Sequence, residues 1–366
     1  MDDVKERNFL VGIFGDNYDL RNLVGQSLGS PGTKSDIQFY NRLDNSLGHV
    51  FCALTPIEYP EKIKPFLQTL SITNIYILVI DLESGLNPVI GEILVGMDTY
   101  NRLFQKRALV IISNISSKTE WKLVETKKKI RTILDTTTLK DSEIIEIREK
   151  LDYENIKKKI TEIGTTLPES EVGTPTYTKV LIDHSFPVKG IGTVILGIVK
   201  NGELSVNQML ELIGYEDSGK KVIIRSIQKQ DRDYKTAYEG DRVGLALKGN
   251  ISHDQISRDN ILVNTGIFKQ EKKIVAKVHI NQFFIPKEGI IKPGNGIQYF
   301  GMVEIKSSPL KFVEGEDLLP GKTGKVTIEL EKSLVHDGTG LKGVITEMNK
   351  FENKLRIVGS FEQILN

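Results

Sequence analysis

Short aliphatic runs alternate with amphipathic segments in the first part of the chain. The aliphatic runs cover residues 9–14, 49–54, 75–80, 108–112 and 143–147. The segments with helical periodicity between them cover residues 58–70, 87–103, 118–133 and 154–163. Uninterrupted aliphatic strands that alternate with helices are typical of a mostly parallel sheet with both faces covered. The pattern therefore predicts an α/β domain over residues 1–165.

The pattern changes after residues 166–176, a stretch rich in threonine, glutamate, proline and glycine that we interpret as a linker. From residue 177 onward there is no long segment with helical periodicity. Short alternating runs separated by glycine turns predict small closed β-barrels. We expect one barrel over residues 177–266 and a second over residues 267–366. The predicted fold class is therefore α/β followed by all-β, in three domains.

Composition and charge narrow the class of protein. The chain has 49 basic and 48 acidic residues and a formal net charge of +1, which gives no general attraction to nucleic acid. Its single cysteine, Cys52, cannot form an internal disulfide, which fits a reducing compartment. There is no signal-peptide pattern and no apolar run of membrane-spanning length. We therefore expect a cytoplasmic monomer without a membrane segment.

The stretch from residue 10 to residue 28 predicts a buried strand, a tight turn and a helix, which is the layout of a phosphate-binding loop. The loop motif G-x-x-x-x-G-K-[ST] falls on residues 15–22, where Gly15 is kept. Leu20 replaces the second glycine, Arg21 the lysine and Asn22 the serine or threonine. Leu20 adds a side chain where phosphates would lie, and Asn22 lacks the hydroxyl that holds Mg²⁺. The stretch is either a chance strand–turn–helix or a nucleotide loop that has lost its chemistry.

A family signature lies further along the chain. Residues 186–202 read F-P-V-K-G-I-G-T-V-I-L-G-I-V-K-N-G. They resemble the domain-two signature F-x-[VI]-x-G-x-G-T-V-x-x-G-x-V-x-x-G of the translational GTPases related to elongation factor Tu, with one residue more before Gly197. The runs R-S-I-Q at 225–228 and E-G-D-R-V-G-L-A-L-K-G at 239–249 resemble the selenocysteine-specific elongation factors in particular. The resemblance implies a P-loop-type α/β domain followed by two β-barrels.

The resemblance locates three further nucleotide motifs, and each is altered. The magnesium and γ-phosphate motif D-x-P-G-H falls on residues 53–57, A-L-T-P-I, after a strand expected to end near Cys52. The guanine motif N-K-x-D falls on residues 114–117, N-I-S-S, and the S-A-K motif on residues 148–150, R-E-K. The remnant of the nucleotide site is therefore limited to five residues, which are Gly15, Arg21, Asn22, Asn114 and Lys150. We expect no catalytic residue, no metal and no cofactor.

The scaffold between the altered motifs fits the family better than the motifs do, as in the strand at 75–81 and the helix from about residue 87. This selective loss predicts a pseudo-GTPase, an elongation-factor-like translation protein without GTP hydrolysis or GTP binding and with one fixed domain arrangement. It would serve as a binding platform for tRNA, the ribosome or a translation component. Candidate contacts on the first barrel, for which ordinary barrel surface is the plainer interpretation, are Arg225, Gln228, Arg232, Arg242 and Lys248.

Other interpretations stay open. The chain could be an active GTP-binding elongation factor with GTP or GDP and Mg²⁺, in which Arg21 holds the β-phosphate and Asp16 or Asp19 recruits the metal. It could also be an unrelated enzyme on the same scaffold, although its five histidines show no metal-ligand spacing. A non-nucleotide anion at the amides that start the helix after Gly15 is open as well.

Overall fold

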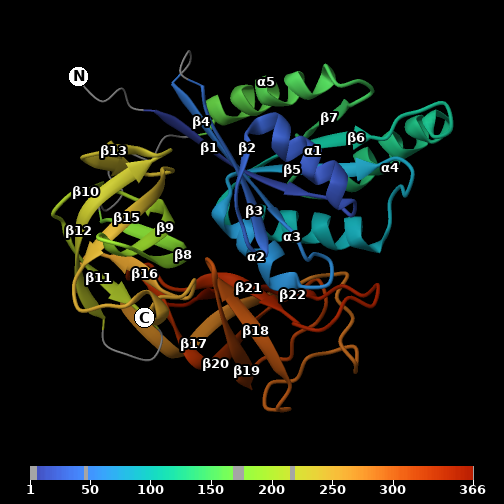
Figure 1. Cartoon of the computed structure of the whole chain (residues 1–366). Helices are drawn as coiled ribbons and strands as arrows, with labels where there is room; N and C mark the ends of the chain where they lie inside the picture. Colours follow the sequence, from blue (N-terminus) through green and yellow to red (C-terminus); the bar gives the residue numbers. More distant parts are fainter. Residues whose placement is uncertain (1–5, 45–47, 168–176, 215–218, 366) are drawn as a thin grey trace.

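A seven-stranded sheet forms the centre of the N-terminal domain in the computed structural model, which describes residues 6–44, 48–167, 177–214 and 219–365 (Figure 1). The strand order is β2-β3-β4-β1-β5-β6-β7. Strands β4, β1, β5, β6 and β7 are parallel, and β3 and β2 are added antiparallel at one edge. The strands are β1 (Arg7–Phe14), β2 (Ser30–Lys34), β3 (Ile37–Asp44), β4 (His49–Pro56), β5 (Ile75–Asp81), β6 (Arg107–Ser113) and β7 (Glu143–Glu146).

Helices cover both faces of this sheet. Helices α1 (Tyr18–Leu28) and α5 (Asp152–Thr165) share one buried apolar cluster with one face. Helices α2 (Ile63–Ile72), α3 (Pro88–Phe104) and α4 (Leu123–Asp135) share a second cluster with the other face. Alternate residues of β5 and β6 belong to each cluster, which is why these strands read as continuous aliphatic runs. The prediction of a mostly parallel sheet covered on both faces is confirmed.

Two features of the sheet differ from the sequence prediction. The hairpin β2–β3 was not predicted at all. Strand β4 continues to Pro56 and does not end near Cys52. The reason is the pairing with β3, which runs along the whole of β4 from His49 to Pro56. Ala53 and Leu54 are therefore interior strand residues, and a loop can begin only after Pro56.

Two closed antiparallel β-barrels follow, as predicted. The first is closed by β8 (Lys179–Val188), β9 (Gly192–Asn201), β11 (Met209–Ile213), β12 (Lys220–Lys229), β15 (Arg242–Lys248) and β16 (Ile261–Val263). Short strands β10 (Glu203–Ser205), β13 (Arg232–Tyr234) and β14 (Thr236–Tyr238) extend it. The second consists of β17 (Lys269–Ile280), β18 (Gln298–Val303), β19 (Lys306–Gly315), β20 (Thr323–His336), β21 (Lys342–Thr346) and β22 (Ile357–Gln363). Most of the predicted linker, residues 168–176, lies outside the described residues.

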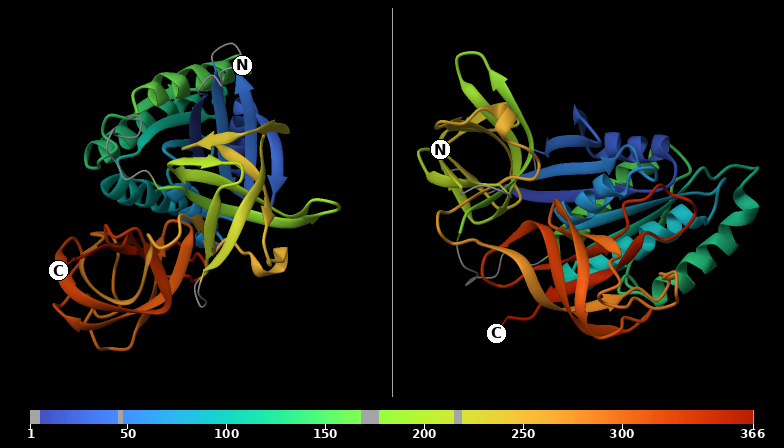
Figure 2. Two further views of the ribbon diagram at one scale, coloured as in Figure 1. Left: turned by 90° about the vertical axis from the view of Figure 1, so that its left-hand side faces the viewer. Right: turned by 90° about the horizontal axis from the view of Figure 1, so that it is seen from below.

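Both barrels rest against the α/β domain (Figure 2). One buried apolar cluster contains side chains from all three domains, among them Phe39 and Leu54 of the sheet, Leu181 and Val263 of the first barrel, and Ile305 of the second. We call this cluster the three-domain core. Each domain supplies part of this buried apolar surface. Its burial therefore favours one placement of the three domains relative to one another. Within the described ranges, no helix combines the length and apolarity that crossing a membrane requires.

Candidate functional site

The turn after β1 is shorter than a phosphate-binding loop. Helix α1 begins at Tyr18, so only Gly15, Asp16 and Asn17 separate it from β1. Gly15 is required there, because a Cβ atom would lie 2.5 Å from the carbonyl oxygen of Val79. Asn17 is the N-cap, and its Oδ1 accepts hydrogen bonds from the backbone N–H groups of residues 19 and 20 at 3.0 and 3.3 Å. The amides that would cradle phosphates are thus part of a capped helical turn.

Arg21 points into the protein and is 1% exposed. Its Nη1 donates to Thr55 Oγ1 at 3.0 Å and to the carbonyl oxygen of Pro56, and its Nη2 donates to the carbonyl oxygen of Tyr59 at 3.5 Å. Burial lowers the pKa of Arg21 to about 10, so the guanidinium is charged at neutral pH. Asn22, the next remnant of the motif, accepts a hydrogen bond from Tyr40 Oη at 2.7 Å. Both side chains therefore serve contacts within the domain.

The end of β4 offers no magnesium ligand of the expected kind. Thr55, which is fully buried, stands at the carboxyl end of the strand and donates its hydroxyl to the carbonyl oxygen of Ile13 at 3.0 Å. Pro56 has no N–H group to offer to a phosphate. The first carboxylate after the strand is Glu58, which is exposed and pairs with Lys62 at 2.7 Å. Within the described ranges, no group of three or more His, Cys, Asp or Glu side chains could hold a metal ion.

Asp81, at the end of β5, connects the turn after β1 to the segment that follows β6. Its carboxylate accepts hydrogen bonds from Asn17 Nδ2 and Asn114 Nδ2, both at 2.8 Å. Asp16 accepts from Ser84 Oγ at 2.7 Å and from Asn87 Nδ2 at 2.6 Å. Sequence reasoning missed this network, although a carboxylate at the end of a buried strand is the signal that could have found it. The carboxylates of Asp16 and Asp81 lie beside the start of α1 and oppose the binding of an anion there.

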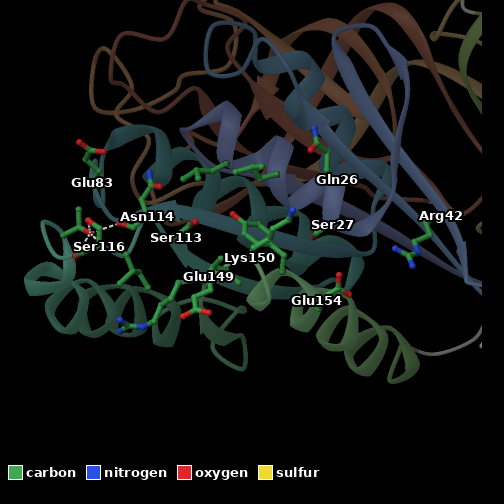
Figure 3. Close-up of a pocket in the computed structure, with 17 residues that line it drawn as sticks. Gln26, Ser27, Arg42, Glu83, Ser113, Asn114, Ser116, Glu149, Lys150 and Glu154 are labelled. Carbon is green, nitrogen blue, oxygen red and sulfur yellow. Dashed lines mark hydrogen bonds between the residues drawn. The ribbon is translucent and has the colours of Figure 1, made fainter.

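A cavity of about 780 Å³ lies beside this network, between α1, the end of β6 and the segment that joins β7 to α5 (Figure 3). Asn114 and Lys150 line it, whereas Gly15, Arg21 and Asn22 do not. Its charged side chains are of both signs in equal number, Arg42, Arg148, Lys150, Glu83, Glu149 and Glu154. The structure therefore divides the five remnant residues into two groups, and only the base-side group faces open space.

Four of the five candidate barrel contacts are exposed, and two of these already make a hydrogen bond within the barrel. Arg232 and Lys248 are exposed, Arg225 is exposed but donates to the carbonyl oxygen of Ile191 at 3.1 Å, and Gln228 is exposed but donates to Asp233 at 2.9 Å. Arg242 lies elsewhere, and this corrects the expectation that it is available to a partner. Its guanidinium pairs with Asp183 at 2.9 Å and stacks 3.6 Å from the ring centroid of Phe39 in β3. The strand pattern placed it on the outer barrel face, but the α/β domain covers that part of the face.

Sequence reasoning also missed part of the exposed barrel surface. In the sheet register, Ile223 of β12 stands between Lys248 of β15 and Met209 of β11. Lys221, two residues before Ile223, faces the same side because strand side chains alternate. Met209 is 54% exposed, and Arg225 is the extra residue of a β-bulge in the same strand. We call Met209, Lys221, Ile223, Arg225 and Lys248 the basic–apolar patch.

Comparison with known proteins places the chain in a family. The family model described as elongation factor Tu domain 2 matches residues 192–258. An uncharacterised protein of Methanocaldococcus jannaschii is 30% identical over 327 residues, which cover 89% of this chain and 91% of that protein. The selenocysteine-specific elongation factor of the same organism is 31% identical over 218 residues, 58% of this chain and 45% of that protein.

Solved structures share the fold. Translation elongation factor SelB from Methanococcus maripaludis, in complex with the GTP analogue GppNHp, superposes with a TM-score of 0.81 at 24% identity, covering 99% of this chain and 80% of that one. The apo form of that factor gives a TM-score of 0.80 at the same identity, covering 98% of this chain and 80% of that one. The chain is therefore related to elongation factor Tu and to the selenocysteine-specific elongation factor SelB: it contains the elongation factor Tu domain 2, and its whole length has the SelB fold.

Proposed function

We propose that this chain is an elongation-factor-like translation protein that neither binds nor hydrolyses GTP and acts as a binding platform for tRNA, the ribosome or another translation component. The position of Arg21 carries the proposal. Arg21 is the only cation at the phosphate-loop motif, and its guanidinium is engaged by Thr55 and by the carbonyl oxygens of Pro56 and Tyr59. A bound phosphate would have to compete with these buried contacts for the same cation.

The charges around the turn add to this argument. A triphosphate carries several negative charges and would meet the carboxylates of Asp16 and Asp81 without a metal ion between them. The helix amides offer little compensation, because the Asn17 cap already occupies those of residues 19 and 20. We therefore expect the phosphate side to disfavour nucleotides, although the base side keeps an open cavity.

The test is calorimetric titration of the whole chain with GTP and with GDP, each with and without Mg²⁺. We expect no heat of binding and no change in melting temperature. The melting temperature is a sensitive control, since a ligand at a hundredfold excess over its dissociation constant stabilises the native state by about 2.7 kcal/mol. Binding at micromolar affinity would overturn the proposal and return the chain to the nucleotide-binding elongation factors.

A variant with the loop motif restored tests whether the side chains of the motif or the short backbone turn before α1 prevents nucleotide binding. Leu20→Gly, Arg21→Lys and Asn22→Thr together rebuild the motif in sequence. We expect this triple variant to remain unable to bind GTP, because α1 still begins at Tyr18 and Asn17 still caps it. Recovery of micromolar binding would show that side chains alone account for the loss and that the short turn is not the obstacle.

The basic–apolar patch is the surface that we propose for an RNA partner. Lys221, Arg225 and Lys248 have no carboxylate partner within the described ranges, and Met209 offers apolar contact beside them. Cations contact phosphates, and exposed apolar side chains contact bases. We expect Lys221→Glu with Lys248→Glu to weaken binding to total tRNA or ribosomes and to reduce its salt dependence. Lys292→Glu, at an exposed lysine of the second barrel, is the matched control and should change neither.

A further inference from the structure

Arg21 holds the segment that connects β4 to α2. Its guanidinium is bonded to the carbonyl oxygens of Pro56 and Tyr59, which lie at the start and in the middle of this segment. The ring of Tyr59 stacks on Phe66 of α2, with ring centroids 4.4 Å apart and planes 28° apart. Tyr59 and Phe66 are both buried. The position of the connection, and with it the start of α2, therefore depends on a side chain of α1.

Helix α2 reaches both barrels through one side chain. Gln68 is 1% exposed, and its Nε2 donates to the carbonyl oxygen of Ile305 in the second barrel at 2.7 Å. Its Oε1 accepts from Arg258 Nη1 of the first barrel at 3.1 Å. Lys64, one turn earlier in α2, pairs with Asp259 at 3.7 Å. A shift of α2 along or about its axis would break bonds to both barrels at once.

The same arginine of the first barrel binds the hairpin turn of the α/β domain. Arg258 pairs with Asp36 at 2.8 Å and donates to Ser35 Oγ at 3.2 Å, both in the turn between β2 and β3. On the second barrel, Glu304, which precedes Ile305, pairs with Lys179 of the first barrel. We call Gln68, Arg258, Asp36 and Ile305 the three-domain junction. It lies at the edge of the three-domain core, so polar and apolar contacts fix the same meeting point.

We propose that Arg21 acts as an internal ligand: its guanidinium orders the connection from β4 to α2 and, through α2 and Gln68, holds the three domains in one arrangement. A diffusible ligand shifts a conformational equilibrium only when it is present and only by its differential affinity for the two states. A guanidinium within the same chain is always present, so the arrangement that it holds does not vary with the concentration of any ligand. The proposal concerns coupling within the chain and stands or fails separately from nucleotide binding and from RNA binding.

The experiment is hydrogen–deuterium exchange of the whole chain and of the Arg21→Ala variant. We expect amides of residues 57–72 to exchange about tenfold faster or more in the variant. We also expect faster exchange at the three-domain junction, in peptides around residues 257–260 and 303–306, which make no hydrogen bond to Arg21. The matched control is Arg131→Ala, because Arg131 likewise donates to two backbone carbonyls, at 2.7 Å each. Its effect should stay local, near residues 138–143.

Two further measurements distinguish coupling from general loosening. Methylguanidinium added at millimolar concentration should restore slow exchange at the junction in Arg21→Ala. It should not do so in Gln68→Leu, where the cation site is intact and the link to the barrels is cut. Faster exchange confined to residues 57–60, with an unchanged junction, would overturn the proposal. If Arg21→Ala does not fold, Arg21→Lys is measured in its place. Faster exchange that includes the three-domain junction then supports the proposal, and faster exchange confined to residues 57–60 overturns it.

Discussion

Replacement of Glu92 by alanine should destabilise the chain strongly, because Glu92 forms a buried ion pair between two domains. Glu92 lies in α3, and Arg356 lies beside β22 in the second barrel. Both side chains are at most 2% exposed. Arg356 Nε donates to both carboxylate oxygens at 3.0 and 3.1 Å, and Nη2 donates to Oε2 at 2.9 Å. In Glu92→Ala the guanidinium would lose its carboxylate and keep the carbonyl oxygen of Asn349, at 3.2 Å, and the rings of Phe351 and Tyr59, whose centroids lie 5.0 and 6.0 Å away.

The magnitude follows from the charge that is left behind. Removing one partner of a buried pair costs about 3–5 kcal/mol, since the remaining charge is neither hydrated nor paired. Replacing both residues by leucine removes the uncompensated charge, so Glu92→Leu with Arg356→Leu should cost less than Glu92→Ala alone. The two sites should therefore show a large coupling free energy in a double-mutant cycle.

Urea titration followed by far-ultraviolet circular dichroism measures these free energies of unfolding, provided that a second probe gives the same midpoint. The matched control is Glu58→Ala, which removes a pair of similar length, 2.7 Å, whose side chains are 44% and 64% exposed. We expect the control to shift the midpoint little, because exposed pairs are hydrated and screened. If Glu92→Ala shifted it no more than the control, or if the double variant were the least stable, the argument from buried charge would be refuted.

Two further predictions concern other positions. Gly25→Ala in α1 should lower the melting temperature, because its Cβ would overlap the buried ring of Tyr40. Gly91→Ala in α3 should raise stability by about 1 kcal/mol, because its Cβ would meet nothing within 4 Å and alanine favours a helix. Equal changes in the melting temperatures of the two variants would contradict both expectations. Burial lowers the pKa of Lys106 well below its ordinary value, so the folded chain holds fewer protons than the unfolded chain above that lowered pKa. Stability should therefore rise with pH between that lowered pKa and the ordinary lysine value of about 10.4 in the wild type. Urea midpoints of Lys106→Met, measured over the same pH range, should lack this part of the rise.

Most of the fold could be predicted from the sequence because its signals are local. Continuous aliphatic strands and amphipathic helices appear directly in the pattern, and so do the short alternating strands of the barrels. The hairpin β2–β3 and the last residues of β4 could not be predicted in this way. Their conformation depends on pairing between strands, as in the pair Ile37 and Pro56. In addition, a proline usually indicates the end of a strand, so the sequence predicts that β4 stops before Pro56.

The candidate site was predictable in composition but not in geometry. Leu20, Arg21 and Asn22 depart from the phosphate-loop motif in sequence, and this departure predicts a loss of phosphate binding. The direction of the Arg21 side chain could not be predicted, since its acceptors lie 34 to 38 residues away in the chain. The same holds for Arg242, whose position in β15 suggested free barrel surface until the packing of β3 against it was known. Pairings between domains are invisible to a pattern of local periodicity.

The phosphate-loop side and the base side of the α/β domain differ in structure, and the difference bears on the role of this domain. On the phosphate side, Asn17 and Arg21 bind groups of the chain itself, while Asp16 Oδ1 and Arg21 Nε are buried without a hydrogen-bond partner in the described part of the chain. The base side has an open cavity lined by charged side chains of both signs. Gln68 of α2 bonds to both barrels, and Arg21 bonds to the connection that precedes α2, so we infer that this domain serves to hold the barrels in place.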